Sequence, residues 1–141
     1  MLRILQFLMI VAFAMSSAPS DSHEIKAGQL IIVHPWIKQS DDQSTAYGCM
    51  KITNKGQVDD HLVSATIGHG ILFQLLDVTG SGTASVKTIV IPAGQTIQLH
   101  ARSSHIAVIS NSSPSFEGST VPGTLTFERT GPIAIDFEIG G

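Results

Sequence analysis

Short runs in which hydrophobic and polar residues alternate recur along most of the chain, with turn-forming residues between them. The clearest run is 133–139, where every second residue is Ile or Phe and the residues between are Ala, Asp and Glu. This period of two gives a strand one buried and one exposed face. A similar run at 124–128 precedes it, and the residues 129–132 between them, Arg-Thr-Gly-Pro, suit a turn. The two runs are predicted to form a hairpin.

Further runs of the same kind lie upstream, and none of them has a helical stripe long enough to compete. The fold class predicted is therefore all-β, with about nine short strands in a sandwich or Greek-key barrel, because so many short strands need two faces to enclose a core. The predicted upstream strands are 29–34, 46–54, 61–67, 71–78, 85–91, 96–100 and 105–110.

The first residues have the pattern of a signal peptide. Arg3 precedes an apolar stretch at 4–14, and small residues follow it. Eleven apolar residues are fewer than the roughly twenty that a transmembrane helix needs. We therefore expect a signal peptide at 1–20, cleaved after Ala14, Ser20 or nearby, and a single domain at 21–141 in the periplasm or outside the cell, without a membrane span after cleavage. No cysteine follows the apolar stretch at the position of a lipidation site, since Cys49 lies far downstream, so lipidation there is not expected.

Composition fits a folded domain and excludes some functions. Hydrophobic residues make up 43% of the chain and charged residues 13%, which is enough apolar surface for a core. The formal net charge is -3 and the eight Lys and Arg residues are scattered, so a nucleic-acid partner is not expected. No nucleophile elbow, zinc-protease motif, phosphate loop or C-x-x-C motif occurs, and we expect no enzyme activity.

Neither the single cysteine nor the adjacent acidic residues indicate a catalytic or binding site. Cys49 is the only cysteine, so no internal disulfide can form, and it is expected to be a small core residue. The acidic pairs Asp41 with Asp42 and Asp59 with Asp60 are adjacent, so their side chains point in opposite directions in an extended segment. We expect both pairs in solvated turns.

Histidine is the residue type that suggests a site, since six occur and imidazole is a common ligand of copper and zinc. His100 ends one predicted strand and His105 begins the next, so they could approach each other. Alternation directs His100 outward. It also places Ile106 and Val108 inward, which leaves His105 and Ala107 on the opposite, more exposed face. His105 and His100 are therefore candidate metal ligands.

A third candidate depends on where the signal peptide is cut. Cleavage after Ser20 would leave Asp21, Ser22 and His23 as the new amino terminus. A free amine, two deprotonated amides and an imidazole at the third position can hold copper(II) in a square-planar set. His23 is then a candidate ligand for copper, with mass spectrometry of the exported chain as its test.

Several landmarks together resemble one known family. These landmarks are His-Pro-Trp at 34–36, Ile-Thr-Asn at 52–54, Ile-Pro-Ala-Gly at 91–94, His105 and Gly-Thr-Leu-Thr-Phe-Glu at 123–128. In order and spacing they are similar to PCu(A)C periplasmic copper chaperones. The resemblance implies a cupredoxin-like, immunoglobulin-like Greek-key β-sandwich. It also implies a protein that carries copper in the periplasm toward a recipient copper protein.

The copper ligands of that family are mostly missing here. The family holds copper(I) with a His or Met, a second Met and a closing His-x-Met motif. By resemblance, only the closing histidine is kept, as His105, because Ala107 replaces its Met partner. The first ligand aligns with Leu76, and the middle Met falls in 83–87, which contains no Met. A copper(I) site is therefore not expected.

Two functions follow from these observations. The first is an exported metal-binding protein that uses His105 with His100 or His23, with copper as its cofactor or cargo; any binding would be weak and of the copper(II) or zinc(II) type. The alternative is a periplasmic protein-interaction module on the same fold that binds no metal, with its contact surface around Trp36 and Tyr47.

Overall fold

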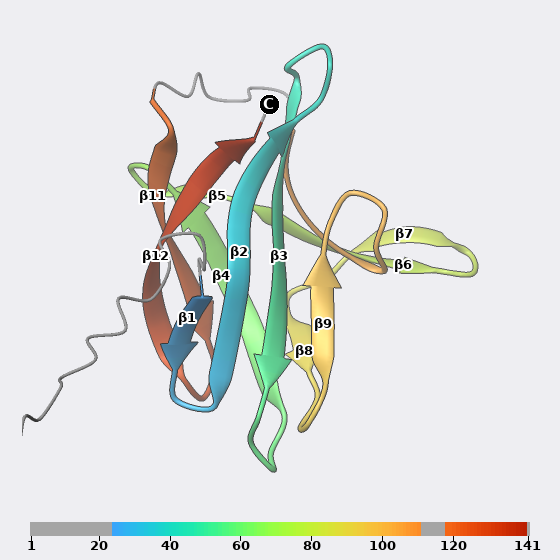
Figure 1. Ribbon diagram of the computed structural model, residues 1–141. Helices are drawn as coiled ribbons and strands as arrows, with labels where there is room; N and C mark the ends of the chain where they lie inside the picture. Colours follow the sequence, from blue (N-terminus) through green and yellow to red (C-terminus); the bar gives the residue numbers. More distant parts are fainter. Residues whose placement is uncertain (1–23, 111–117, 141) are drawn as a thin grey trace, which may run out of the picture.

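The computed structural model describes residues 24–110 and 118–140, which form twelve strands (Figure 1). No helix able to cross a membrane occurs in these two segments. The all-β class predicted from the sequence is confirmed. The strands are β1 (Glu24–Ala27), β2 (Leu30–Gln39), β3 (Thr45–Asn54), β4 (Asp60–Ile67), β5 (Ile71–Leu72), β6 (Gln74–Thr79), β7 (Gly82–Ser85), β8 (Ile89–Ile91), β9 (Thr96–Leu99), β10 (His105–Ser110), β11 (Thr120–Phe127) and β12 (Gly131–Gly140).

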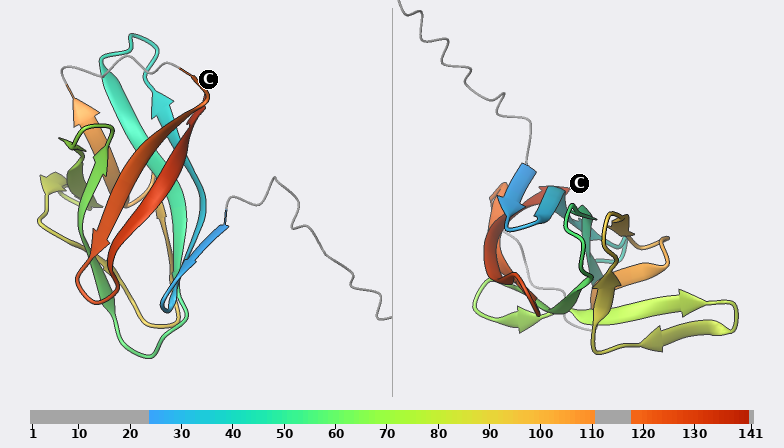
Figure 2. Two further views of the ribbon diagram at one scale, coloured as in Figure 1. Left: turned by 90° about the vertical axis from the view of Figure 1, so that its left-hand side faces the viewer. Right: turned by 90° about the horizontal axis from the view of Figure 1, so that it is seen from below.

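All twelve strands are hydrogen-bonded into one curled sheet. Its main path runs β5-β4-β11-β12-β2-β3-β9-β10-β6-β7, while β1 joins β2 and β8 joins β4. Seen from below, the strands of the body surround an interior, and the β6–β7 hairpin extends beyond it (Figure 2). The curl lets one sheet enclose a core with its inner face, as two packed sheets would.

The core is built from the alternating hydrophobic positions of these strands. Phe127 of β11 and Phe137 of β12 are almost fully buried, and the hairpin predicted around them is confirmed. Each buried large side chain contributes about 1.5–3 kcal/mol. The largest fully buried side chains are Phe127, Phe137, Leu30, Ile32, Ile37, Ile52, Leu62, Ile67, Ile89, Ile91, Leu99 and Leu125.

Two predicted strands are each divided in the structure. The run 71–78 becomes β5 and β6 because the buried Phe73 separates them; β5 pairs with β4, whereas β6 pairs with β10. The run 85–91 is divided in the same way, since β7 pairs with β6 and β8 with β4. At these points the chain leaves one neighbouring strand and pairs with another. The alternation of hydrophobic and polar residues does not reveal such a change.

Strand β2 is longer than predicted and changes its partner halfway. Its first half pairs with β1, a strand that was not predicted, and its second half pairs in parallel with β12. A β-bulge lies between Val33 and Trp36, where the pairing with β3 shifts. His34, inside the bulge, has a φ of 54°, which is uncommon for a residue with a side chain. Bulges of this kind redirect the side chains around them.

The prediction for Asp60 is wrong, because this residue is buried rather than solvated, with 3% of its surface exposed. Its carboxylate accepts hydrogen bonds from the backbone N–H groups of His61, Arg129 and Thr130 and from the Thr130 hydroxyl. Burial raises the pKa of Asp60, but these hydrogen bonds outweigh it and hold the pKa below its usual value. Asp60 therefore joins the start of β4 to the turn between β11 and β12.

Candidate metal centre

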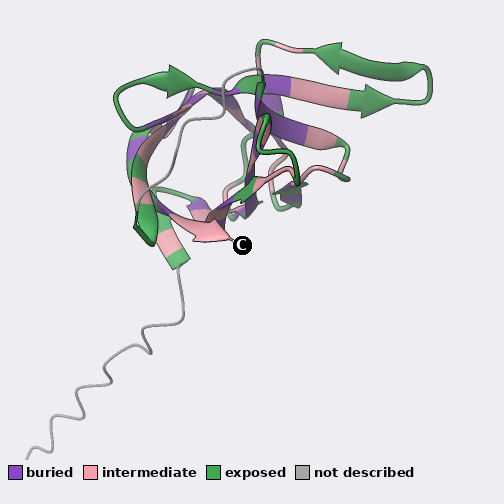
Figure 3. Cartoon of the chain, turned by 90° about the horizontal axis from the view of Figure 1, so that it is seen from above, coloured by how far each residue is buried: buried purple, intermediate pink, exposed green. Residues whose placement is uncertain are grey.

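His105 faces a carboxylate across two neighbouring strands. It is the first residue of β10, and its partner in the antiparallel pairing with β6 is Asp77. The distance between His105 Nδ1 and Asp77 Oδ1 is 2.7 Å. The two side chains are 30% and 33% exposed. Asp77 belongs to the β6–β7 hairpin, which projects from the body of the sheet and is exposed toward its tip (Figure 3).

This contact decides which ring nitrogen of His105 can bind a metal. A carboxylate accepts hydrogen bonds and cannot donate them, so His105 Nδ1 carries the proton that Asp77 receives. The neutral ring then has its free lone pair on Nε2. A carboxylate behind a histidine is the usual arrangement for a metal ligand, because it fixes the ring and makes the other nitrogen more basic. His105 is thus oriented as an imidazole ligand.

His100 has the opposite arrangement. Its Nδ1 accepts a hydrogen bond from the backbone N–H of Arg102 at 3.3 Å, so in the neutral ring the proton lies on Nε2. The ring lies near Trp36, with 6.3 Å between the ring centroids. The structure therefore does not present His100 Nε2 as a free ligand.

The two histidines are joined through the backbone rather than through their rings. His100 N and His105 O are 3.4 Å apart, and the Ser103 hydroxyl lies 2.5 Å from the same His105 oxygen while accepting a hydrogen bond from His100 N. Leu99 pairs with His105 and is buried in the core. His100, the next residue, turns to the outer side with Trp36, as expected, so the structure does not bring the two rings together.

The third candidate, His23, lies outside the described residues. Within the described part of the chain, no three His, Cys, Asp or Glu side chains gather into a group that could hold a metal ion. His105, oriented by Asp77, is therefore a single candidate ligand to which others must be added.

The positions that resemble the copper(I) ligands are placed by the strand register. Leu76 pairs with Ile106, whereas Asp77 pairs with both His105 and Ala84. Cross-strand partners share a face of the sheet, so the neighbours of His105 on its own face are Asp77 and then Ala84 on one side and the buried Leu99 on the other. Leu76, which aligns with the first ligand, points to the other face.

Ala107 was expected on an exposed face with His105, and this expectation is wrong. Ala107 is 1% exposed and belongs to the hydrophobic core. Its strand lies between β3 and β6, where Ala107 pairs with Gly48 and Leu75, and the ring of Phe73 covers the same place. Both faces of β10 are covered, so the alternation in its sequence does not separate buried from exposed residues.

The remaining sulfur groups are buried elsewhere. Cys49 is 1% exposed, as expected for a small core residue, and burial raises the pKa of its thiol to about 11, although the charge of Lys38 opposes this. A neutral thiol is a poor metal ligand. Met50 is 4% exposed and packs in the core.

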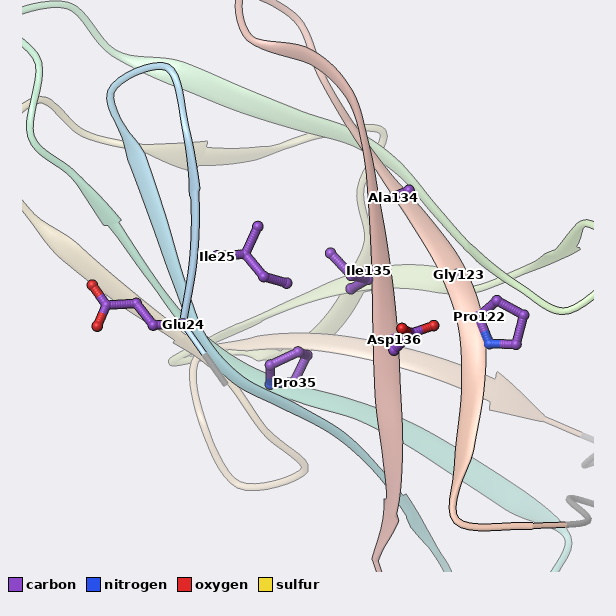
Figure 4. A pocket seen from close by; sticks show the side chains of 8 residues that line it. All are labelled: Glu24, Ile25, Pro35, Pro122, Gly123, Ala134, Ile135 and Asp136. Atoms are coloured by element: carbon purple, nitrogen blue, oxygen red, sulfur yellow. The ribbon is translucent and has the colours of Figure 1, made fainter. Parts of the chain in front are cut away.

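A separate hollow of about 420 Å³ lies between β1 and β12 (Figure 4). Glu24 and Asp136 contribute carboxylates to its lining, and Ile25 and Ile135 contribute apolar surface. Neither His100 nor His105 lines it. This hollow is therefore distinct from the surface around His105.

Comparisons with known proteins agree on the fold. A family model described as "Putative lipoprotein LpqE-like" matches residues 30–139. The copper-bound PCuAC domain from PmoF2 superposes with a TM-score of 0.69 at 22% identity, covering 84% of this chain and 98% of that domain. The apo PCuAC domain from PmoF1 gives 0.68 at 24% identity, covering 84% and 99%. No curated protein matches the chain. The predicted β-sandwich of this type is confirmed.

Proposed function

The chain belongs to the LpqE-like family and has the fold of PCuAC domains, and on this basis we propose that it is an exported metal-binding protein that holds copper(II) or zinc(II) at His105. The metal is its cargo, and a copper protein outside the cytoplasm is the partner expected to receive it. The observation that carries the proposal is the 2.7 Å contact between His105 Nδ1 and Asp77 Oδ1.

The donor atoms around His105 favour these two metals over copper(I). Copper(I) prefers thioether and thiolate sulfur, whereas imidazole and carboxylate suit copper(II) and zinc(II). The neighbours of His105 on its own face are Asp77, Ala84 and Leu99, which supply no sulfur. Met50, the next residue in this row beyond Leu99, is 4% exposed and packs in the core. Asp77 supports the ring from its Nδ1 side, and a metal at Nε2 takes its remaining ligands from water or from a partner protein.

Export is part of the proposal. Arg3, the apolar stretch at 4–14 and the small residues after it support a cleaved signal peptide. The description of the family as a lipoprotein supports a location outside the cytoplasm. The proposal needs this location, because the copper protein that receives the metal is expected outside the cytoplasm.

The proposal is tested by titrating the exported chain with copper(II), zinc(II) and copper(I) by calorimetry. We expect copper(II) and zinc(II) to bind more tightly than copper(I). His105→Ala should remove this binding, and Asp77→Asn should weaken it by about ten- to a hundredfold, because the carboxylate that fixes the ring is lost. His69→Ala is the matched control, since His69 is exposed in the turn after β4, a strand that pairs with neither β6 nor β10.

Mass spectrometry of the same sample defines its amino terminus and shows whether His23 can contribute to metal binding. If the chain begins at Asp21, the titration is repeated with His23→Ala. Binding that survives His105→Ala but is lost in His23→Ala would place the metal at the amino terminus and contradict the site at His105. No metal bound more tightly than about millimolar, about 4 kcal/mol, would contradict the carrier function altogether.

A further inference from the structure

The outer face of β2, β3 and β9 has a small hollow beside the only tryptophan of the chain. Trp36 is half-buried there and pairs with Cys49 across β2 and β3, while its ring lies near that of His100. The hollow has a volume of about 250 Å³, below the roughly 300–1,000 Å³ of small-molecule sites. Its lining includes His34, Trp36, Cys49, Lys51 and His100.

Cationic side chains gather around this hollow, although the chain as a whole is acidic. Lys51 lines it, and Lys38 is close enough to Cys49 for its charge to lower the pKa of the buried thiol. Lys38 and Lys51 are both exposed. Arg102, also exposed, follows His100 in the next loop. These three cations are set in a chain of net charge -3.

None of the described residues that line the hollow is acidic. Glu138 of β12 pairs with Trp36 and is half-buried. The two imidazoles of His34 and His100 add hydrogen-bonding groups to the lining of the hollow. The face therefore combines an aromatic ring with an excess of positive charge, and Trp and Arg are the residue types that most often dominate protein interfaces.

We propose that this basic face, defined by Trp36, Lys38, Lys51, His100 and Arg102, binds an acidic segment of a partner protein. A carboxylate side chain of that segment enters the hollow beside Lys51, and Trp36 packs against the segment. Charge complementarity of this kind steers the encounter and fixes the partner's orientation.

A nucleic acid fits this face less well. Binding to a phosphate backbone draws on many Lys and Arg contacts along the strand, whereas this face has three such residues and the rest of the chain repels a polyanion. A metal is also a poor fit, because the Cys49 thiol is neutral and His100 Nδ1 already accepts a hydrogen bond. A hollow of this size suits one side chain.

Trp36 reports on the binding directly, because its fluorescence is the only tryptophan signal in the chain. The probe is a synthetic ten-residue peptide rich in Glu, titrated at low salt. We expect a saturable change in Trp36 emission that weakens as salt is raised. Lys51→Glu and Lys38→Glu should each weaken binding at least tenfold. Lys55→Glu makes the same charge change away from the face and is the matched control.

Four further outcomes decide the proposal, with the thermal transition of each variant confirming its folding. His105→Ala should bind the peptide as the unchanged chain does, which separates this face from the metal site. An equal loss of peptide affinity in Lys55→Glu would show a general charge effect and overturn the proposal. Tighter binding of a single-stranded RNA of the same length would overturn the choice of partner, and the absence of a saturable signal up to millimolar peptide would overturn the face itself.

Discussion

Asp77 Oδ1 lies 2.7 Å from His105 Nδ1, whereas Leu76, one residue earlier on the same strand, pairs with Ile106 and faces the other side of the sheet. A strand changes face at every residue, so this difference of one position decides what surrounds the histidine. The register places the Asp77 carboxylate and the small side chain of Ala84 on the face of His105, in place of the soft ligands of copper(I).

Returning sulfur to the correct face should change the metal preference. Ala84 is exposed on β7 and pairs with Asp77. The variant Ala84→Met places a thioether on the face of His105, and together with Asp77→Met it provides two. We expect the double variant to bind copper(I) at least tenfold more tightly than the unchanged chain, because thioethers suit copper(I). Competition with a coloured copper(I) chelator measures this change.

The control for this prediction uses the neighbouring position. Ser85 pairs with Leu76, on the other face of the hairpin. Ser85→Met adds the same side chain to the same strand and should leave copper(I) affinity unchanged. An equal gain in Ser85→Met would show that the sheet faces are assigned wrongly around His105.

Asp60 should make stability depend on acid pH. Its folded-state pKa is below the usual carboxyl value of 3.8, so its stabilisation is present above that value and is lost as the pH falls through the lower, folded-state pKa. In Asp60→Asn, the side-chain amide N–H group faces the N–H and O–H donors that bind the carboxylate. We expect the free energy of unfolding to fall by about 1–3 kcal/mol at neutral pH. The free energy of unfolding of this variant should also fall less steeply between pH 4 and pH 2.

Urea denaturation at several pH values measures both effects of Asp60→Asn. The control is Asp41→Asn, which changes an exposed aspartate and should stay within about 0.5 kcal/mol of the unchanged chain. A variant Asp60→Asn as stable as this control would contradict the role given to the buried carboxylate.

Gly140 should be needed for the position of Trp36. A Cβ added at Gly140 would collide with the six-membered ring of Trp36. We expect Gly140→Ala to displace the ring, lower the free energy of unfolding by about 1–3 kcal/mol and change the tryptophan emission. Gly80→Ala is the control, since a Cβ at Gly80 would meet nothing within 4 Å. Unchanged emission in Gly140→Ala would contradict the packing of Trp36 against this strand.

The sequence predicted the fold class because its signal is repeated along the chain. The alternation at 133–139 and at 124–128 corresponds to the buried side chains of β12 and β11. The division of 71–78 at Phe73 could not be predicted, because it depends on which strands become neighbours. Ala107 was misplaced for the same reason, since its burial depends on core residues from other parts of the chain, the ring of Phe73 among them, and not on the sequence of its own strand.

The site could be predicted only in part. His105 stood out as an imidazole at a strand end, and the resemblance placed it at a ligand position. Asp77 was missed because its role depends on the register of β6 against β10, and the two residues are 28 positions apart. Asp60 was missed in a similar way, since the donors at Arg129 and Thr130 lie about 70 positions along the chain. A single sequence carries no local signal for such distant pairs.

The most direct test of the site is the nuclear magnetic resonance of the imidazole nitrogens during a zinc(II) titration at neutral pH. Before zinc is added, His105 should have its proton on Nδ1, held by Asp77, and His100 should have its proton on Nε2. Zinc should then shift the Nε2 signal of His105 and leave the signals of His100 unchanged. A His105 signal that stays unchanged up to millimolar zinc would contradict a metal centre at this residue.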